Sequence, residues 1–194
     1  MHSDPKQTLP SIDTNGGPVL AIPAEQLKDW RGTLAPKGVR APPGWAWGDR
    51  GGPACDYDRA CGKREQVVQL GAVDSLATIP VGRARALVLE SATTTTFARL
   101  DEGGVLVRGT TIRIEQAREA IALAKKWKKT PHLWTLPSGR FHLLDSAMSG
   151  SKAKTVRCVM LPGTYAIEGA EVPFLGTFIS LWRLVAPKPR LKRA

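Results

Sequence analysis

The chain has 194 residues, of which 42% are apolar and 23% are charged, and this ordinary globular usage excludes a chain that is disordered throughout. Its 28 Lys and Arg residues face 17 Asp and Glu residues, and the net charge of +11 favours nucleic acid, anionic lipid or an acidic protein surface as a partner. Much of the excess is local, because residues 115–129 carry five positive and two negative charges, and residues 186–194 carry four positive charges and no negative one.

The cysteine count and the hydropathy pattern bear on the compartment. Three cysteines are an odd number, which argues against a complete disulfide framework and for a reducing environment, although Cys55 and Cys61 leave a single bridge open. The first residues show no apolar segment behind a basic start, and no apolar run is long enough to cross a bilayer. We therefore expect a cytoplasmic protein with no membrane contact.

The N-terminal quarter of the chain alternates between turn signals and short elements. Residues 1–14 are mostly polar and are expected to be flexible. A turn then leads into a short strand at residues 19–22, and residues 23–30 begin with proline and predict a short helix. Residues 31–53 are rich in Pro and Gly and predict a long loop. Trp45 and Trp47 in this loop either bury against the domain or serve as partner anchors.

A charged, aromatic segment between two cysteines follows this loop. It contains Asp56, Tyr57, Asp58 and Arg59, and its side chains can build a clamp of hydrogen bonds between an arginine and a carboxylate. One interpretation is a loop that pins its own backbone through the Asp side chains. The other is contact with a partner, since function concentrates on loops. We keep all four residues as candidate partner-binding residues.

The remainder of the chain is dominated by strand patterns around a single long helical one. Strands are predicted near residues 66–70, 76–81, 85–90, 93–97, 105–108, 134–136, 140–147, 155–161, 164–168 and 178–184. The helix is predicted over residues 115–129. This pattern predicts an α+β fold with a mostly antiparallel β-sheet, one main helix and a short N-terminal helix. We expect a single domain over residues 15–185, followed by a basic tail at residues 186–194.

The predicted main helix carries both an apolar stripe and a group of lysines. The stripe consists of Ala117, Ala120, Ile121, Ala124 and Trp127. Four lysines lie late in the helix, where they either complement the helix dipole or bind an acidic partner. These candidate partner-binding residues are Lys125, Lys126, Lys128 and Lys129.

No motif in the sequence points to catalysis, to a cofactor or to a metal. His142, Asp145 and Ser146 could supply a nucleophile triad, but neighbours in one segment are more readily explained by turn hydrogen bonds. The histidines and cysteines lack the spacing of a zinc site, and the paired glycines lack the residues of a phosphate loop. We expect no enzyme, no cofactor and no metal. An enzyme that uses Asp56 and Asp58 is the least favoured alternative.

Nucleic-acid binding is the main alternative function, because of the net charge. A nucleic-acid-binding surface is expected to interleave basic residues with aromatic ones, or to contain a known module. The basic tail has no aromatic residue, and no module motif is present.

Several short motifs follow one another between residues 15 and 184. In chain order they include Gly16-Gly17-Pro18, Trp30-Arg31-Gly32, Asp56-Tyr57-Asp58-Arg59-Ala60-Cys61, Ile79-Pro80-Val81-Gly82, Gly103-Gly104-Val105-Leu106-Val107-Arg108, Leu144-Asp145-Ser146-Ala147 and Pro162-Gly163-Thr164-Tyr165. Together they resemble the immunity protein 21 family of bacterial polymorphic toxin systems. The Pro-rich segment 35–53, the lysine-rich helix and the basic tail depart from the family's pattern.

The resemblance implies a cytoplasmic protein that binds a cognate toxin and blocks it sterically, with no turnover and no cofactor. It supplies no toxin-contact residues, so the candidates remain those named above. A basic inhibitor suits a toxin with an acidic contact face, because opposite charges speed capture.

Overall fold

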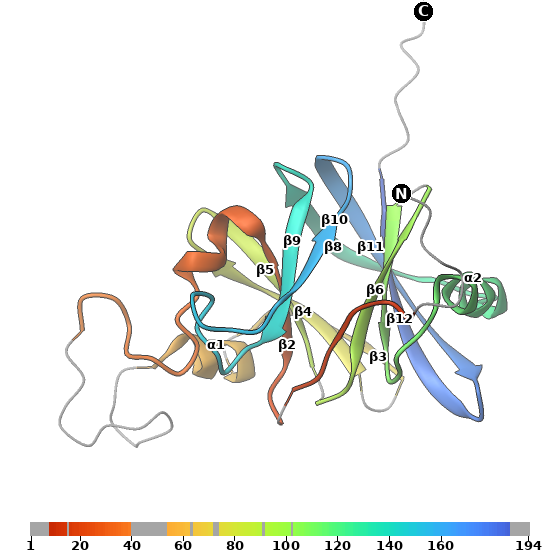
Figure 1. Cartoon of the computed structure of the whole chain (residues 1–194), viewed down its shortest axis with the longest axis horizontal. Coiled ribbons are helices and arrows are strands. Elements are labelled where there is room, and N and C mark those ends of the chain that lie inside the picture. The colour runs from red at the N-terminus through yellow and green to blue at the C-terminus, as the bar shows by residue number, and fades with distance from the viewer. Residues whose placement is uncertain are drawn as a thin grey trace, which may run out of the picture.

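The computed structural model describes the backbone of residues 8–14, 16–39, 54–62, 64–71, 74–90, 92–101 and 103–186. The described strands form two six-stranded sheets in which every pairing is antiparallel (Figure 1). In sheet A the order is β1 (Ser11–Ile12), β6 (Thr95–Leu100), β7 (Gly103–Arg108), β12 (Thr177–Val185), β11 (Gly163–Phe174) and β8 (Lys128–Leu136). In sheet B it is β10 (Val156–Val159), β9 (Arg140–Asp145), β2 (Val19–Pro23), β5 (Ala84–Leu89), β4 (Asp74–Val81) and β3 (Glu65–Leu70).

The two sheets pack face to face over a shared hydrophobic core. Because side chains alternate along a strand, each sheet sends one set of residues inward. Leu76, Leu87 and Phe141 of sheet B meet Phe97 and Leu106 of sheet A in a single cluster of buried residues. This inner cluster supplies the main hydrophobic stabilisation of the two sheets.

The outer face of each sheet is covered by helices, so the layers run helix, sheet, sheet, helix (Figure 1). Helix α2 (Ile114–Leu123) places Ala117 and Ala120 on the outer face of sheet A. The 3₁₀-helix η1 (Ala24–Asp29) and helix α1 (Asp56–Gly62) lie on the outer face of sheet B. Both outer clusters thus bury the apolar residues that the alternation directs away from the inner core.

The predicted fold class is confirmed, with one long helix and a short N-terminal helix that is a 3₁₀-helix. The main helix is shorter than predicted: it ends at Leu123 and not at residue 129. Lys128 and Lys129 already belong to β8, where they pair with Gly169 and Glu168 of β11. The apolar stripe continues to Trp127, but that residue packs on the cluster from beyond the helix.

Two other segments gain regular structure from tertiary contacts. Of the segment predicted to be flexible, residues 1–14, the structure describes residues 8–14, where Ser11 and Ile12 form β1 and pair with Thr96 and Thr95 of β6. The charged segment after the long loop is helix α1 and not a loop. Tertiary contacts decide both cases, since a two-residue strand and a seven-residue helix are marginal in isolation.

A charged pair lies buried between the two sheets. Arg108 of β7 is 1% exposed, and its Nε lies 3.2 Å from Oδ1 of Asp74 of β4. Its Nη1 donates to Thr95 Oγ1 at 2.7 Å, and the indole of Trp182 donates to Asp74 Oδ2 at 2.9 Å. Burial raises the pKa of Asp74, while the charge of Arg108 and the Trp182 hydrogen bond oppose that rise. Asp74 and Arg108 thus pair their charges in the interior, with Thr95 and Trp182 as further hydrogen-bond partners.

The three cysteines are all free, with Cys55 buried and Cys61 exposed. Within the described part of the chain, no helix has the length and apolar character needed to cross a membrane.

Candidate partner-binding site

Helix α1 is held at its start by the carboxylate of Asp58. Oδ2 of Asp58 accepts from the backbone N–H of Cys55 at 2.9 Å and from its Sγ at 3.0 Å. This is the contact in which an acid in the first turn satisfies a backbone donor just before the helix. Burial raises the pKa of the Cys55 thiol to about 11, so the group stays protonated at neutral pH.

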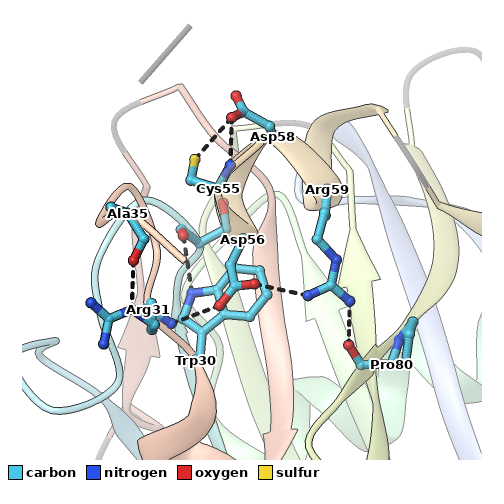
Figure 2. A network of polar contacts seen from close by, with 9 residues as sticks. Trp30, Arg31, Ala35, Cys55, Asp56, Asp58, Arg59 and Pro80 are labelled. Atoms are coloured by element: carbon cyan, nitrogen blue, oxygen red, sulfur yellow. Dashed lines mark hydrogen bonds and ion pairs between the residues drawn. The ribbon is translucent and has the colours of Figure 1, made fainter. Parts of the chain in front are cut away.

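Asp56 and Arg59 join α1 to the rest of sheet B's outer face (Figure 2). Oδ2 of Asp56 accepts from the backbone N–H of Arg31 at 2.9 Å, and its Oδ1 accepts from Arg59 Nη1 at 2.8 Å. Arg59 Nη2 then donates to the carbonyl of Pro80 on β4 at 2.6 Å. The structure therefore contains the predicted arginine–carboxylate clamp, and the clamp connects three separate segments.

Replacing Asp56 by alanine is expected to lower the free energy of unfolding by about 1–3 kcal/mol, because the Arg31 amide and the Arg59 guanidinium would lose their acceptor. Urea denaturation measures the change. The matched control is Asp101→Ala, which removes an exposed aspartate from the turn between β6 and β7. Equal stability of the two variants would show that the clamp contributes nothing to the fold.

Residues 30–32, which precede the clamp in the sequence, are also held by hydrogen bonds and close packing. Trp30 is 1% exposed, and its indole donates to the carbonyl of Ser146 at 3.1 Å. Gly32 has a φ of +60°, and a Cβ there would collide with the backbone of Ala147. The carbonyl of Gly32 accepts from the N–H of Tyr57 at 3.1 Å. The described segments on either side of residues 40–53 are thus bonded to each other.

Tyr57 faces inward from α1. A Cβ at Gly17 would lie 2.8 Å from its ring, so the ring packs closely on that glycine. Burial and a hydrogen bond with Cys61 raise the pKa of Tyr57 to about 12. Of the four candidate residues on α1, all have roles in holding the helix in place.

The four candidate lysines lie in a different place. All are exposed, and they follow α2 on the side of sheet A. Lys128 Nζ donates to the carbonyl of Gln69 at 2.9 Å. The last turn of α2 has no basic residue, and Lys128 and Lys129 belong to β8, so the helix-dipole explanation does not hold for these two lysines. The structure does not bring Lys125 and Lys126 near Asp56, because the two sheets separate them.

The remaining sequence candidates fall outside what the structure describes. Trp45 and Trp47 lie in residues 40–53, and most of the basic tail lies in residues 187–194; both segments are outside the described residues.

The alternative chemical sites are not assembled. His142 Nδ1 lies 3.0 Å from Thr155 Oγ1, and Asp145 Oδ1 accepts from the N–H of Ala147 at 2.9 Å, which is the predicted turn hydrogen bond. Among the described residues, no three His, Cys, Asp or Glu side chains gather as a metal site requires.

One cationic group was missed by sequence reasoning. Arg140 and His142 lie on β9, and the pairing of β9 with β10 places Arg157 opposite His142. In the sequence these are three scattered residues, and only the strand register brings them together.

The comparison with known families decides the identity. The protein-family model described as immunity protein 21 matches residues 11–174 of the sequence, from β1 to the end of β11. This chain belongs to the immunity protein 21 family. No curated protein and no solved structure matches it in the two other comparisons.

Membership confirms the resemblance found in the sequence. Immunity proteins neutralise toxins and are inhibitors, not enzymes, so the expectation of a non-catalytic protein is confirmed. The partner of this immunity protein is a cognate toxin.

Proposed function

We propose that this immunity protein neutralises its toxin in the cytoplasm by steric occlusion, through a stoichiometric complex and without chemical change. The observation that carries this proposal is the state of the polar groups on α1. Asp56, Asp58 and Arg59 are all bonded within the protein, as expected of a rigid, pre-shaped surface and not of a reactive site. A rigid surface binds tightly because little conformational entropy is lost on association.

The clamp on α1 gives the long loop a fixed base. Residues 31–35 and 55–59 flank residues 36–54, and their mutual hydrogen bonds hold both flanks against sheet B. We propose that Asp56, Tyr57, Asp58 and Arg59 position this loop, and that Trp45 and Trp47 act as its anchors on the toxin. Tryptophans are enriched among residues that dominate binding energy.

The exposed lysines give the protein a means of attracting its partner. Lys125, Lys126, Lys128 and Lys129 are close in sequence and exposed, and the whole chain carries a net charge of +11. We propose that the toxin has an acidic contact face, which these charges steer toward the immunity protein.

Occlusion is tested by titrating the immunity protein into the toxin domain encoded beside its gene. Toxin activity is expected to fall in proportion to added inhibitor and to vanish at equimolar ratio. Toxin recovered after dissociation with denaturant and refolding is expected to have unchanged mass and activity. Inactivation by a small fraction of an equivalent, or a changed toxin mass, would show turnover and contradict occlusion.

The steering proposal is tested by the double variant Lys125→Glu, Lys126→Glu. Its association rate constant with the toxin is expected to fall several-fold at low salt and to depend less on salt, because long-range charge acts mainly on association. The dissociation rate constant is expected to stay within about twofold. Stopped-flow fluorescence measures both. An unchanged association rate and salt dependence would remove the lysines from the mechanism.

The alternative, a nucleic-acid-binding protein, rests on the net charge alone. It predicts affinity for unrelated duplex DNA that falls steeply with salt, in the absence of toxin binding.

A further inference from the structure

A basic groove lies on the outer face of sheet B, beside η1. It has a volume of about 350 Å³. We define the basic groove by the arginines Arg140 and Arg157, by His142 between them, and by the apolar side chains of Ala24, Leu27 and Val159.

The strand register builds this groove. Arg157 of β10 pairs with His142 of β9, and Val159 pairs with Arg140. Paired residues on antiparallel strands point to the same face. Phe141 and Cys158 alternate with them and point into the inner core, where both are buried. The groove residues are therefore forced onto the outer face together.

The arginines of the groove are not held in ion pairs within the described part of the chain. Arg59, Arg64, Arg85, Arg108 and Arg183 each form an ion pair, but within the described part of the chain neither Arg140 nor Arg157 does. Arg140 Nε reaches only the hydroxyl of Ser138, at 3.4 Å. Lys152 and Lys154 are exposed on the connection that leads into β10.

Two titratable groups beside the arginines, His142 and Glu25, have pKa values that are shifted by the positive charge. Burial lowers the pKa of His142, and the charges of Arg157 and Arg140 lower it further. Glu25 of η1 is the acidic group near the rim. Its pKa is lowered chiefly by a hydrogen bond with Ser138, and the charge of Arg140 also lowers it, although the two side chains form no ion pair. Two guanidinium groups that form no ion pair within the described part of the chain thus face one groove, together with an imidazole whose lowered pKa favours its neutral form.

We propose that the basic groove is a contact site that receives an acidic side chain of the toxin, with the carboxylate between Arg140 and Arg157. This inference rests on the proposed function and assigns it a surface. A guanidinium binds a carboxylate through two parallel hydrogen bonds, and two arginines around one groove match a single inserted Asp or Glu. Leu27 and Val159 provide apolar contact for the stem of that side chain.

The lining favours a carboxylate over nucleic acid. Proteins that bind single strands stack bases on exposed aromatic rings. The one phenyl ring of the lining, that of Phe141, is fully buried and offers no face to a base, and the imidazole of His142 is half-buried and lies 3.0 Å from Thr155 Oγ1 through its Nδ1.

The groove also lies beside the fixed base of the long loop. Helix η1 contributes Ala24 and Leu27 to the groove, and Trp30 and Arg31 follow directly after it. Because Arg31 is bonded to Asp56 of α1, the groove and the loop base share the outer face of sheet B. The lysines after α2 lie beyond the other sheet and are not part of this surface.

The test compares two double variants that change the net charge equally. Arg140→Glu, Arg157→Glu reverses the groove, and Lys125→Glu, Lys126→Glu reverses the exposed lysines. The probe is a catalytically inactive form of the toxin domain encoded beside the gene. We expect the groove variant to raise the dissociation rate constant at least tenfold, because it removes a direct contact. We expect the lysine variant to change only the association rate constant.

Four further results decide the inference. The neutral variant Arg140→Gln, Arg157→Gln is expected to raise the dissociation rate constant by a smaller factor than the charge reversal. Thermal unfolding of each variant is the control for correct folding. Wild-type binding with equal dissociation rates for all variants would overturn the groove as a contact and leave occlusion intact. If the wild-type protein does not bind the toxin, the proposed function itself is overturned. If the wild-type protein prefers a 20-nucleotide DNA strand to the toxin, and the groove variant no longer binds that strand, nucleic acid is the occupant of the groove.

Discussion

Replacing Asp74 by alanine is expected to lower the free energy of unfolding by about 3–5 kcal/mol, because it leaves a buried guanidinium without its counter-charge. Arg108 is 1% exposed, so its charge depends on hydrogen-bond partners within the protein. The indole N–H of Trp182 would lose its acceptor at the same time. Urea denaturation followed by tryptophan fluorescence measures the loss.

The control for Asp74 removes both charges. In the double variant Asp74→Ala, Arg108→Met no buried charge is left unpaired, and the loss of stability is expected to be smaller than in Asp74→Ala alone. If the double variant is as unstable as the sum of the two single variants, the pair does not act as a unit and the prediction is wrong.

Replacing Phe141 by alanine is expected to lower the free energy of unfolding by a similar amount, about 3–5 kcal/mol. Phe141 is fully buried between the sheets, and its ring lies edge-on to Phe97 and to Trp134 with centroid distances of 5.0 Å in both cases. The substitution removes apolar area, opens a cavity and ends both aromatic contacts. Thermal and urea unfolding measure the change.

A matched aromatic residue on the surface provides the control. Phe178 is 68% exposed at the start of β12, so Phe178→Ala is expected to change stability by less than about 0.5 kcal/mol. Phe141→Leu keeps most of the volume and is expected to cost less than Phe141→Ala. Comparable losses for Phe141→Ala and Phe178→Ala would mean that the inner core does not depend on this aromatic cluster.

The candidate site was predicted in part. The segment from Asp56 to Arg59 had the composition of a clamp, and the clamp exists, because a carboxylate and a guanidinium three residues apart can meet locally. Its connections to Arg31 and Pro80 span 25 and 21 residues, and no local pattern predicts them. The groove of Arg140, His142 and Arg157 was not predicted, because a one-residue shift of β9 against β10 would move its side chains to the other face.

The sequence by itself determined the elements with a strong period or a strong turn. The strands β4 to β7 follow alternating or apolar runs bounded by glycine turns, and α2 follows its apolar stripe, because these signals are local. The motifs in succession also determined the family. Only the tertiary structure decided where α2 ends, since Lys128 and Lys129 gain more from pairing with β11 than from another helical turn. It also decided that α1 is a helix and that Asp74 meets Arg108, because contacts between distant segments outweigh local preference.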